Sequence, residues 1–178
     1  MKRILVMGIS AGAGKSTFAR KLGDLLQINV HHLDTLFWKP GWKESSVDEF
    51  RSSLEEIVTS PTWIIEGNYS NTYDIRATHA DTIIYLEVPR LVCLYRVLKR
   101  WLTHLGQTRP DMAEGCKEKM ELSFLKFIWT TYYPRKEKMY KRFEQFQLTG
   151  QNKTVIKLKN KAQIHDFLHE LERKHTIL

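Results

Sequence analysis

Short apolar runs alternate with segments of helical periodicity along the chain. Between residues 15 and 26, apolar side chains recur at the spacing of one helix face. Continuous apolar runs are typical of strands that are buried on both faces of a sheet. Because these strands alternate with helices, the pattern predicts a parallel sheet covered on both faces. The predicted strands are 2–7, 30–33, 63–66, 82–88 and 154–158.

Local signals mark the remaining helices. Residues 46–49 have the S-x-x-E form of a capping box and predict a helix through about Thr59. Pro89 suits the first turn of a helix that runs to about Leu105. Helical sequence then continues from Lys117 to near Gly150 with an interruption at Pro134, and a closing helix spans 163–174.

Composition limits the classes of protein that the chain can represent. A length of 178 residues with 42% hydrophobic content predicts one domain over 1–178. The start is too short in apolar residues for a signal peptide, and no run approaches the roughly 18 residues that span a membrane, so we expect a cytoplasmic protein. Residues 90–161 hold 17 Lys and Arg against 6 Asp and Glu, which indicates an anionic partner: nucleic acid, a membrane surface or a small phosphorylated ligand.

Residues 8–17, GISAGAGKST, follow the first predicted strand and lead into the first predicted helix. Backbone N–H groups in such a turn can point at phosphate oxygens only where side chains are small. Lys15 places a positive charge on the β- and γ-phosphates, and Ser16 offers its hydroxyl to Mg²⁺. The segment therefore predicts a P-loop that binds ATP and Mg²⁺, with nucleotide contacts from Gly12, Ala13, Gly14, Lys15, Ser16 and Thr17.

This loop departs from the usual pattern at one position. The pattern G-x-x-x-x-G-K-[ST] requires its first glycine at residue 9, where the chain has Ile9, and the nearest glycine is Gly8. The contacts of 9–11 with the β-phosphate therefore stay open. The structural alternative is an ordinary glycine-rich turn between a strand and a helix.

Several segments resemble a known family. WIIEGNY at 63–69 looks like the strand-three D-G-[FY] motif of adenylate-kinase-like enzymes. HHLDTLFWKPGW at 31–42, ADTIIYLEVPR at 80–90 and TRPDMAEGC at 108–116 closely resemble the DNA topology modulation proteins of that superfamily. The resemblance covers nearly the whole chain. It implies a P-loop NTPase fold, a three-layer α/β/α sandwich with a five-stranded parallel sheet and a helical lid insertion at about 96–135.

The resemblance also implies roles for two carboxylates. Asp34 ends the second predicted strand, where kinases with this fold place a carboxylate that orients the acceptor hydroxyl or binds Mg²⁺ through water. Glu66, at the carboxyl end of the third strand, corresponds to the aspartate that holds Mg²⁺ through water in adenylate kinase. The structural alternatives are an aspartate that opens a loop and a glutamate bonded to the P-loop serine or a helix terminus.

Cationic side chains form a second group of candidates. Arg96 and Arg100 lie one helical turn apart and, with Arg109, match the lid arginines of adenylate-kinase-like enzymes, which stabilise charge on the transferred phosphoryl group. Lys159 corresponds to the position that contacts adenine in this superfamily. Arg76 either binds an acceptor anion or lies on the surface. For Arg96, Arg100 and Arg109 the alternative is a solvated surface position or an intramolecular ion pair, and for Lys159 it is a turn with solvated lysines.

The segment 34–46 is rich in aromatic residues and in Pro and Gly, and it predicts a loop. Trp38 and Trp42 in this loop, with Tyr69, are expected to line an acceptor pocket. There they either stack on a base or sugar or pack against one another.

Three functions follow from these features. The first is an ATP-dependent phosphotransferase, a kinase acting on a small molecule such as a nucleoside, nucleotide or related metabolite. The alternative is an ATP-binding, nucleic-acid-associated regulator that affects DNA topology. A nucleotide-binding regulator without transfer chemistry is a third. Gly67 is followed by Asn68-Tyr69-Ser70, without the arginine of D-G-[FY]-P-R, so the sequence does not name the acceptor.

Overall fold

The computed structural model describes residues 1–104, 106, 108, 112–116, 121–150 and 152–176. A five-stranded sheet lies at its centre, and all neighbouring strands are parallel, in the order β2-β5-β1-β6-β7. The five predicted strands are confirmed. They are β1 (Arg3–Gly8), β2 (Val30–His32), β5 (Trp63–Glu66), β6 (Thr82–Leu86) and β7 (Thr154–Leu158).

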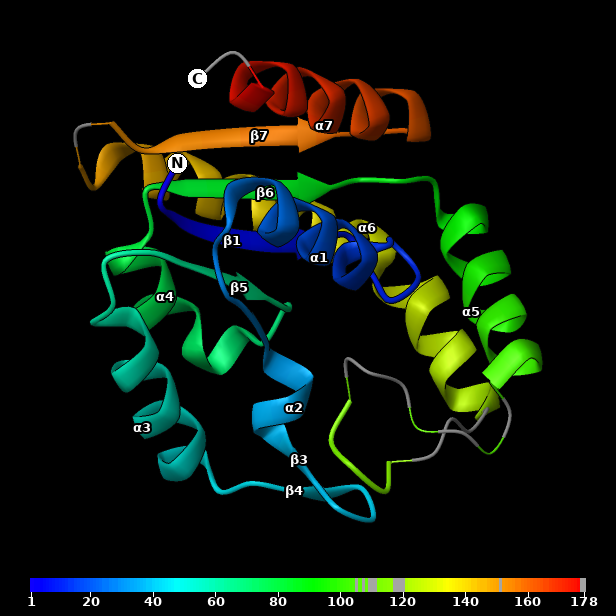
Figure 1. Ribbon diagram of the computed structural model, residues 1–178. Helices are drawn as coiled ribbons and strands as arrows, with labels where there is room; N and C mark the ends of the chain where they lie inside the picture. The colour runs from blue at the N-terminus through cyan, green and yellow to red at the C-terminus, as the bar shows by residue number, and fades with distance from the viewer. Residues whose placement is uncertain (105, 107, 109–111, 117–120, 151, 177–178) are drawn as a thin grey trace.

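Helices cover both faces of this sheet, which confirms the three-layer α/β/α prediction (Figure 1). The rings of Phe18 and Phe167 lie 6.1 Å apart and join α1 to α7 on one face, whereas α4 and α6 lie on the other. The three central strands are buried almost throughout because helices exclude water from both faces. The helices are α1 (Lys15–Leu26), α4 (Tyr73–His79), α6 (Leu122–Leu148) and α7 (Lys161–Thr176).

The carboxyl ends of the strands meet at one edge of the sheet. Figure 1 shows the strand arrows pointing toward this edge, where the P-loop leads into α1 and where α5 (Arg90–His104) lies beside α6. Ligands of open α/β sheets bind at this edge. The predicted lid region, 96–135, comprises the end of α5, the start of α6 and the segment between them. Its role as a lid stays a prediction.

The interruption expected at Pro134 is wrong, because α6 continues through it. Proline removes one helical hydrogen bond. Buried side chains on both sides of Pro134 hold the helix against the core, and the Tyr132 hydroxyl donates to the carbonyl of Val88 at 2.9 Å. Packing therefore outweighs the lost bond. The buried side chains are Ile128, Tyr132, Met139 and Phe143.

The loop expected over 34–46 is also wrong. A short helix, α2 (Leu33–Phe37), leads into an antiparallel pair formed by β3 (Trp38–Lys39) and β4 (Lys43–Glu44). The capping box is confirmed, since the Ser46 hydroxyl accepts from the Glu49 amide at the start of α3 (Val47–Val58). The helix α4 and the 3₁₀ turn η1 (Ser70–Thr72) were not predicted. Among the described residues, no helix combines the length and apolar character that crossing a membrane requires.

Candidate functional site

A cleft of about 980 Å³ opens at the carboxyl edge of the sheet. The P-loop lies at one side of it, α2 and the end of β5 at another, and α5 and α6 beside them. The structure thus brings most of the predicted site residues to one place. Those that line the cleft are Gly12, Gly14, Lys15, Ser16, Thr17, Asp34, Glu66, Arg96 and Arg100.

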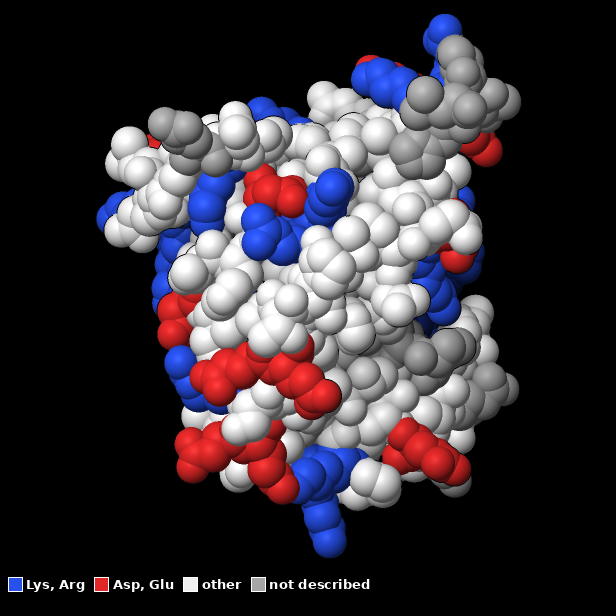
Figure 2. Space-filling model, turned by 60° about the vertical axis from the view of Figure 1, so that its left-hand side comes forward, with Lys and Arg blue, Asp and Glu red and all other residues white. Residues whose placement is uncertain are grey.

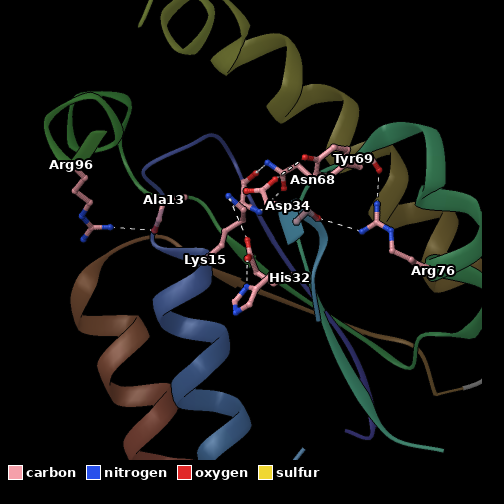
Figure 3. A network of polar contacts seen from close by, with 11 residues as sticks. Ala13, Lys15, His32, Asp34, Asn68, Tyr69, Arg76 and Arg96 are labelled. Atoms are coloured by element: carbon pink, nitrogen blue, oxygen red, sulfur yellow. Dashed lines mark hydrogen bonds and ion pairs between the residues drawn. The ribbon is translucent and has the colours of Figure 1, made fainter. Parts of the chain in front are cut away.

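The P-loop packs closely against α5. Gly12 and Gly14 have φ angles of 77° and 92°, which glycine adopts without strain. A Cβ on Gly12 would lie 2.2 Å from the carbonyl oxygen of Cys93, so this position excludes any side chain. The Arg96 guanidinium donates to the carbonyl of Ala13 at 3.2 Å (Figure 3). The first turns of α5 therefore fix the loop and bring an arginine to it.

Asn68 holds the other end of the loop, a role that the sequence analysis missed. Its side-chain N–H₂ donates to the Gly8 carbonyl at 2.7 Å, and its carbonyl accepts from the Gly8 amide at 3.0 Å. This pair of bonds ties the end of β1 to the segment after β5. Gly8, which precedes the position where the P-loop pattern requires its first glycine, is therefore fixed by two hydrogen bonds.

Glu66 connects the P-loop to β2. Its carboxylate is 3.8 Å from Lys15 Nζ through one oxygen and 2.8 Å from His32 Nδ1 through the other. Glu66 is only 4% exposed. Lys15 and His32, which are labelled in Figure 3, therefore compensate this buried carboxylate.

Asp34 lies in the first turn of α2 and faces the same cleft. The Tyr69 hydroxyl donates to its Oδ1 at 2.7 Å. Burial, and then the negative charge of Asp34, raise the pKa of Tyr69 above its usual range, so the hydroxyl keeps its proton and acts as the donor. Tyr69 therefore orients the Asp34 carboxylate.

The aromatic residues expected at the acceptor pocket do line the cleft. They also pack on one another: the rings of Trp38 and Trp42 meet edge to face at 5.3 Å, and Phe37 lies 4.8 Å from Tyr69. Packing is confirmed. Stacking on a ligand stays a prediction.

Arg76 is neither on the surface nor free to bind a ligand directly. It is fully buried and donates to the backbone carbonyls of Gly67, Tyr69 and Thr72. Burial lowers its pKa to about 10, which leaves the guanidinium charged at neutral pH. Both predictions for Arg76, binding of an acceptor anion and a surface position, are therefore wrong. The side chain instead shapes the segment that carries Asn68 and Tyr69.

The remaining candidates lie elsewhere. Arg109 is outside the described residues. Lys159 is exposed and is not among the residues that line the cleft, and its amide donates to the Gln163 side chain at 2.7 Å. Its contact with adenine stays a prediction. Other side chains line the cleft without having been predicted, and the basic and aromatic ones among them are Arg20, His104, Phe124, Phe127 and Arg135.

The residues at the P-loop fit ATP and Mg²⁺. Gly12 and Gly14 line the cleft with backbone atoms, and Lys15 supplies a cation there. Among the described residues, no three His, Cys, Asp or Glu side chains group as a self-sufficient metal site. Mg²⁺ in nucleotide sites uses one or two protein ligands together with phosphates and water. Ser16 and Glu66 both line the cleft, and their binding of Mg²⁺ stays a prediction.

The fold and this site define a protein with the P-loop kinase fold. No family model matches the chain. A protein of Bacillus subtilis (strain 168), described as "Uncharacterized protein YqaC", is 27% identical over 134 residues, which cover 74% of this chain and 72% of that protein. The likeness to the DNA topology modulation proteins is not confirmed by it and stays a prediction.

Solved structures with a similar fold include two kinds of kinase. Shikimate kinase from Bacteroides thetaiotaomicron is 17% identical with a TM-score of 0.54, and each chain is covered to 97%. Shikimate kinase from Acinetobacter baumannii in complex with shikimate is 17% identical with a TM-score of 0.55, over 98% of this chain and 92% of that one. A gluconokinase from Sinorhizobium meliloti 1021 is 15% identical with a TM-score of 0.54, over 98% and 91%. These likenesses show the fold.

Proposed function

We propose that the chain is an ATP-dependent kinase that phosphorylates a hydroxyl group of a small molecule. One observation carries this proposal: Lys15 of the P-loop and the Asp34–Tyr69 pair open onto the same cleft. A nucleotide-binding regulator without transfer chemistry needs the first of these features and not the second. The names of the similar solved structures, which are kinases, one of them in complex with shikimate, support a small-molecule acceptor.

The side chains have distinct tasks in this proposal. ATP with Mg²⁺ supplies the phosphoryl group. Asp34, held by Tyr69, binds the acceptor hydroxyl and takes its proton. Arg96 and Arg100, on one face of α5, stabilise the negative charge that develops on the transferred group. The cleft brings the acceptor to the nucleotide in a fixed orientation, which lowers the entropic part of the barrier.

A coupled ADP-release assay tests the proposal across nucleosides, nucleotides, sugars and hydroxy acids. We expect acceptor-stimulated ADP release that falls about 100-fold or more in Lys15→Ala, because that variant loses the cation at the phosphates. Lys21→Ala is the matched control, since Lys21 is exposed on the same helix and does not line the cleft. Absence of stimulation by every acceptor, or full turnover by Lys15→Ala, would contradict the proposal.

A further inference from the structure

A second, smaller cavity of about 30 Å³ lies beside the cleft, between the end of β1 and α6. Three of its lining residues, Asn68, Ser70 and Arg135, also line the main cleft. Tyr69, which holds Asp34, lies between Asn68 and Ser70 in the chain. The cavity, which we call the side chamber, therefore adjoins the acceptor end of the cleft, where α6 runs beside the Asn68–Tyr69 segment (Figure 3).

The charged residues that line the side chamber are all cations. Arg135, Lys138 and Arg142 recur at positions i, i+3 and i+7 of α6 and so share one helix face. Arg142 donates to the Ser70 hydroxyl at 3.3 Å, and its guanidinium lies 4.2 Å from the centre of the Tyr73 ring. These contacts fix its direction without neutralising it.

No carboxylate of the described residues forms an ion pair with Arg135 or Arg142. Arg135 instead lies 4.6 Å from the centre of the Phe127 ring. Burial lowers the pKa of both arginines, which is the expected effect of partial dehydration without a counter-ion. Lys138 is exposed and adds a third charge at the rim.

A fourth cation lies beneath the same segment. Arg76 is fully buried, and its hydrogen-bond partners in the described chain are backbone carbonyls rather than carboxylates. After burial, the positive charge of Arg142 is the next cause that lowers the Arg76 pKa. Asp74, the nearby acid, pairs with Arg51 at 3.1 Å. Arg76 and Arg142 therefore place two positive charges beside the segment from Gly67 to Thr72, and a bound anion would offset their mutual repulsion.

We propose that the acceptor carries a phosphate or carboxylate group that binds in the side chamber against Arg135, Lys138 and Arg142, while its hydroxyl lies at Asp34. This inference rests on the proposed kinase function for the identity of the ligand as an acceptor. The acceptor class is then a hydroxylated anion, and neutral sugars and nucleosides are excluded as good acceptors. The bidentate geometry of arginine suits both anionic groups.

Anion titration tests the side chamber without any phosphoryl transfer. The full chain is first saturated with a non-hydrolysable ATP analogue and Mg²⁺, so that the P-loop is filled, and inorganic phosphate or acetate is then added in a calorimeter. We expect saturable binding of at least one of the two, weakened about tenfold in Arg142→Ala and in Lys138→Ala, because each removes a charge-assisted contact. The tighter of the two probes identifies the anionic group.

Two further variants separate recognition from folding. Arg142→Lys keeps the charge and should bind more tightly than Arg142→Ala. Lys141→Ala removes an exposed charge from a position of α6 outside the chamber and should bind as the unmodified chain does. Lys138 is exposed, so Lys138→Ala is expected to fold and tests anion binding by the side chamber even if Arg142→Ala unfolds. No saturable binding of either probe, or unchanged binding in Lys138→Ala, would overturn the proposal.

Acceptor pairs distinguish this inference from the kinase proposal itself. Glucose is compared with gluconate and glucose 6-phosphate, and a nucleoside with its monophosphate, in the ADP-release assay. Stimulation by anionic members alone is expected. Equal stimulation by the neutral members would overturn the side chamber and leave the kinase proposal standing. Saturable anion binding in the calorimeter without stimulation of ADP release by any acceptor would contradict the kinase proposal. The same result would still support the side chamber as an anion site.

Discussion

Arg76 determines the shape of the segment that follows β5 and borders the cleft. Its guanidinium donates to three backbone carbonyls between Gly67 and Thr72, and Asn68, within the same stretch, holds Gly8 of the P-loop. Buried carbonyls that lose their donor carry a full desolvation penalty. A single buried side chain therefore supports both the P-loop and the Tyr69–Asp34 contact.

Arg76→Met should lower the free energy of unfolding by about 3 kcal/mol, because methionine fills similar space and leaves three carbonyls without donors. Arg51→Met is the control: Arg51 pairs with Asp74 and donates to the Asn71 carbonyl, and because water can replace both exposed contacts, their loss should cost less than about 1 kcal/mol. Urea unfolding of both variants measures the difference. Equal stability of the two variants would show that the buried arginine is not structural.

Tyr69→Phe tests whether orientation of Asp34 matters for transfer. Loss of the hydroxyl that donates to Asp34 should lower kcat about tenfold with little change in KM for ATP, because the bond acts on the acceptor side. Tyr73→Phe is the matched control, since the Tyr73 hydroxyl does not line the cleft. Steady-state kinetics with an acceptor from the screen measure both. An unchanged kcat in Tyr69→Phe would remove this role.

At the scale of elements, the sequence predicts those helices, strands and turns whose signals lie within a few neighbouring residues. Strand β1, the P-loop and the start of α3 carry their signals within a few residues, and all three are found where expected. Contacts between distant positions carry no such signal. Asn68 bonds Gly8 across 60 residues, and nothing in either local pattern indicates the partner.

The two wrong predictions of secondary structure, the loop over 34–46 and the interruption at Pro134, also arise from contacts between distant positions. The one-turn helix α2 and the strands β3 and β4 form where aromatic residues pack against α3 and Tyr69, so tertiary contacts override the loop-like composition of 34–46. The continuous path of α6 through Pro134 likewise depends on packing. Arg135 lies just after that proline, where the predicted interruption concealed its place on a helix face.

The contact between the P-loop and α5 gives a prediction at this scale. Gly12→Ala should lower stability by about 3 kcal/mol and weaken ATP binding, because its Cβ would meet the Cys93 carbonyl at 2.2 Å. Gly41→Ala is the control: its φ is also 77°, but nothing lies within 4 Å of the added Cβ, so only about 1 kcal/mol of backbone strain is expected. Unfolding and ATP titration measure both variants. Similar losses in the two would mean that α5 does not constrain the loop.

At the scale of the whole molecule, charge is unevenly distributed. Figure 2 shows most of the acidic side chains of one face in its lower half, where some Lys and Arg side chains also lie, and further Lys and Arg side chains above them. Part of the basic excess of 90–161 lines the cleft or the side chamber, namely Arg96, Arg100, Arg135 and Arg142. The exposed acids of α3 are Asp48, Glu49, Glu55 and Glu56.

We therefore predict weak binding to nucleic acid. Titration of labelled duplex DNA at low salt should give a flat response, or one that vanishes by about 0.2 M salt through counterion release. The same titration with an ATP analogue present tests the nucleotide-gated alternative. Tight binding that ATP controls and that survives at 0.2 M salt would favour the nucleic-acid regulator over the kinase.

Transfer of the terminal phosphate of ATP is the most direct test of the central claim. The chain is incubated with ATP labelled at the γ-phosphate, Mg²⁺ and a mixture of anionic hydroxylated compounds, and the products are separated. We predict label in an organic phosphate ester, lost in Lys15→Ala and retained in Lys21→Ala. Label found only as inorganic phosphate, or left entirely in ATP, would contradict the assignment of the chain as a kinase.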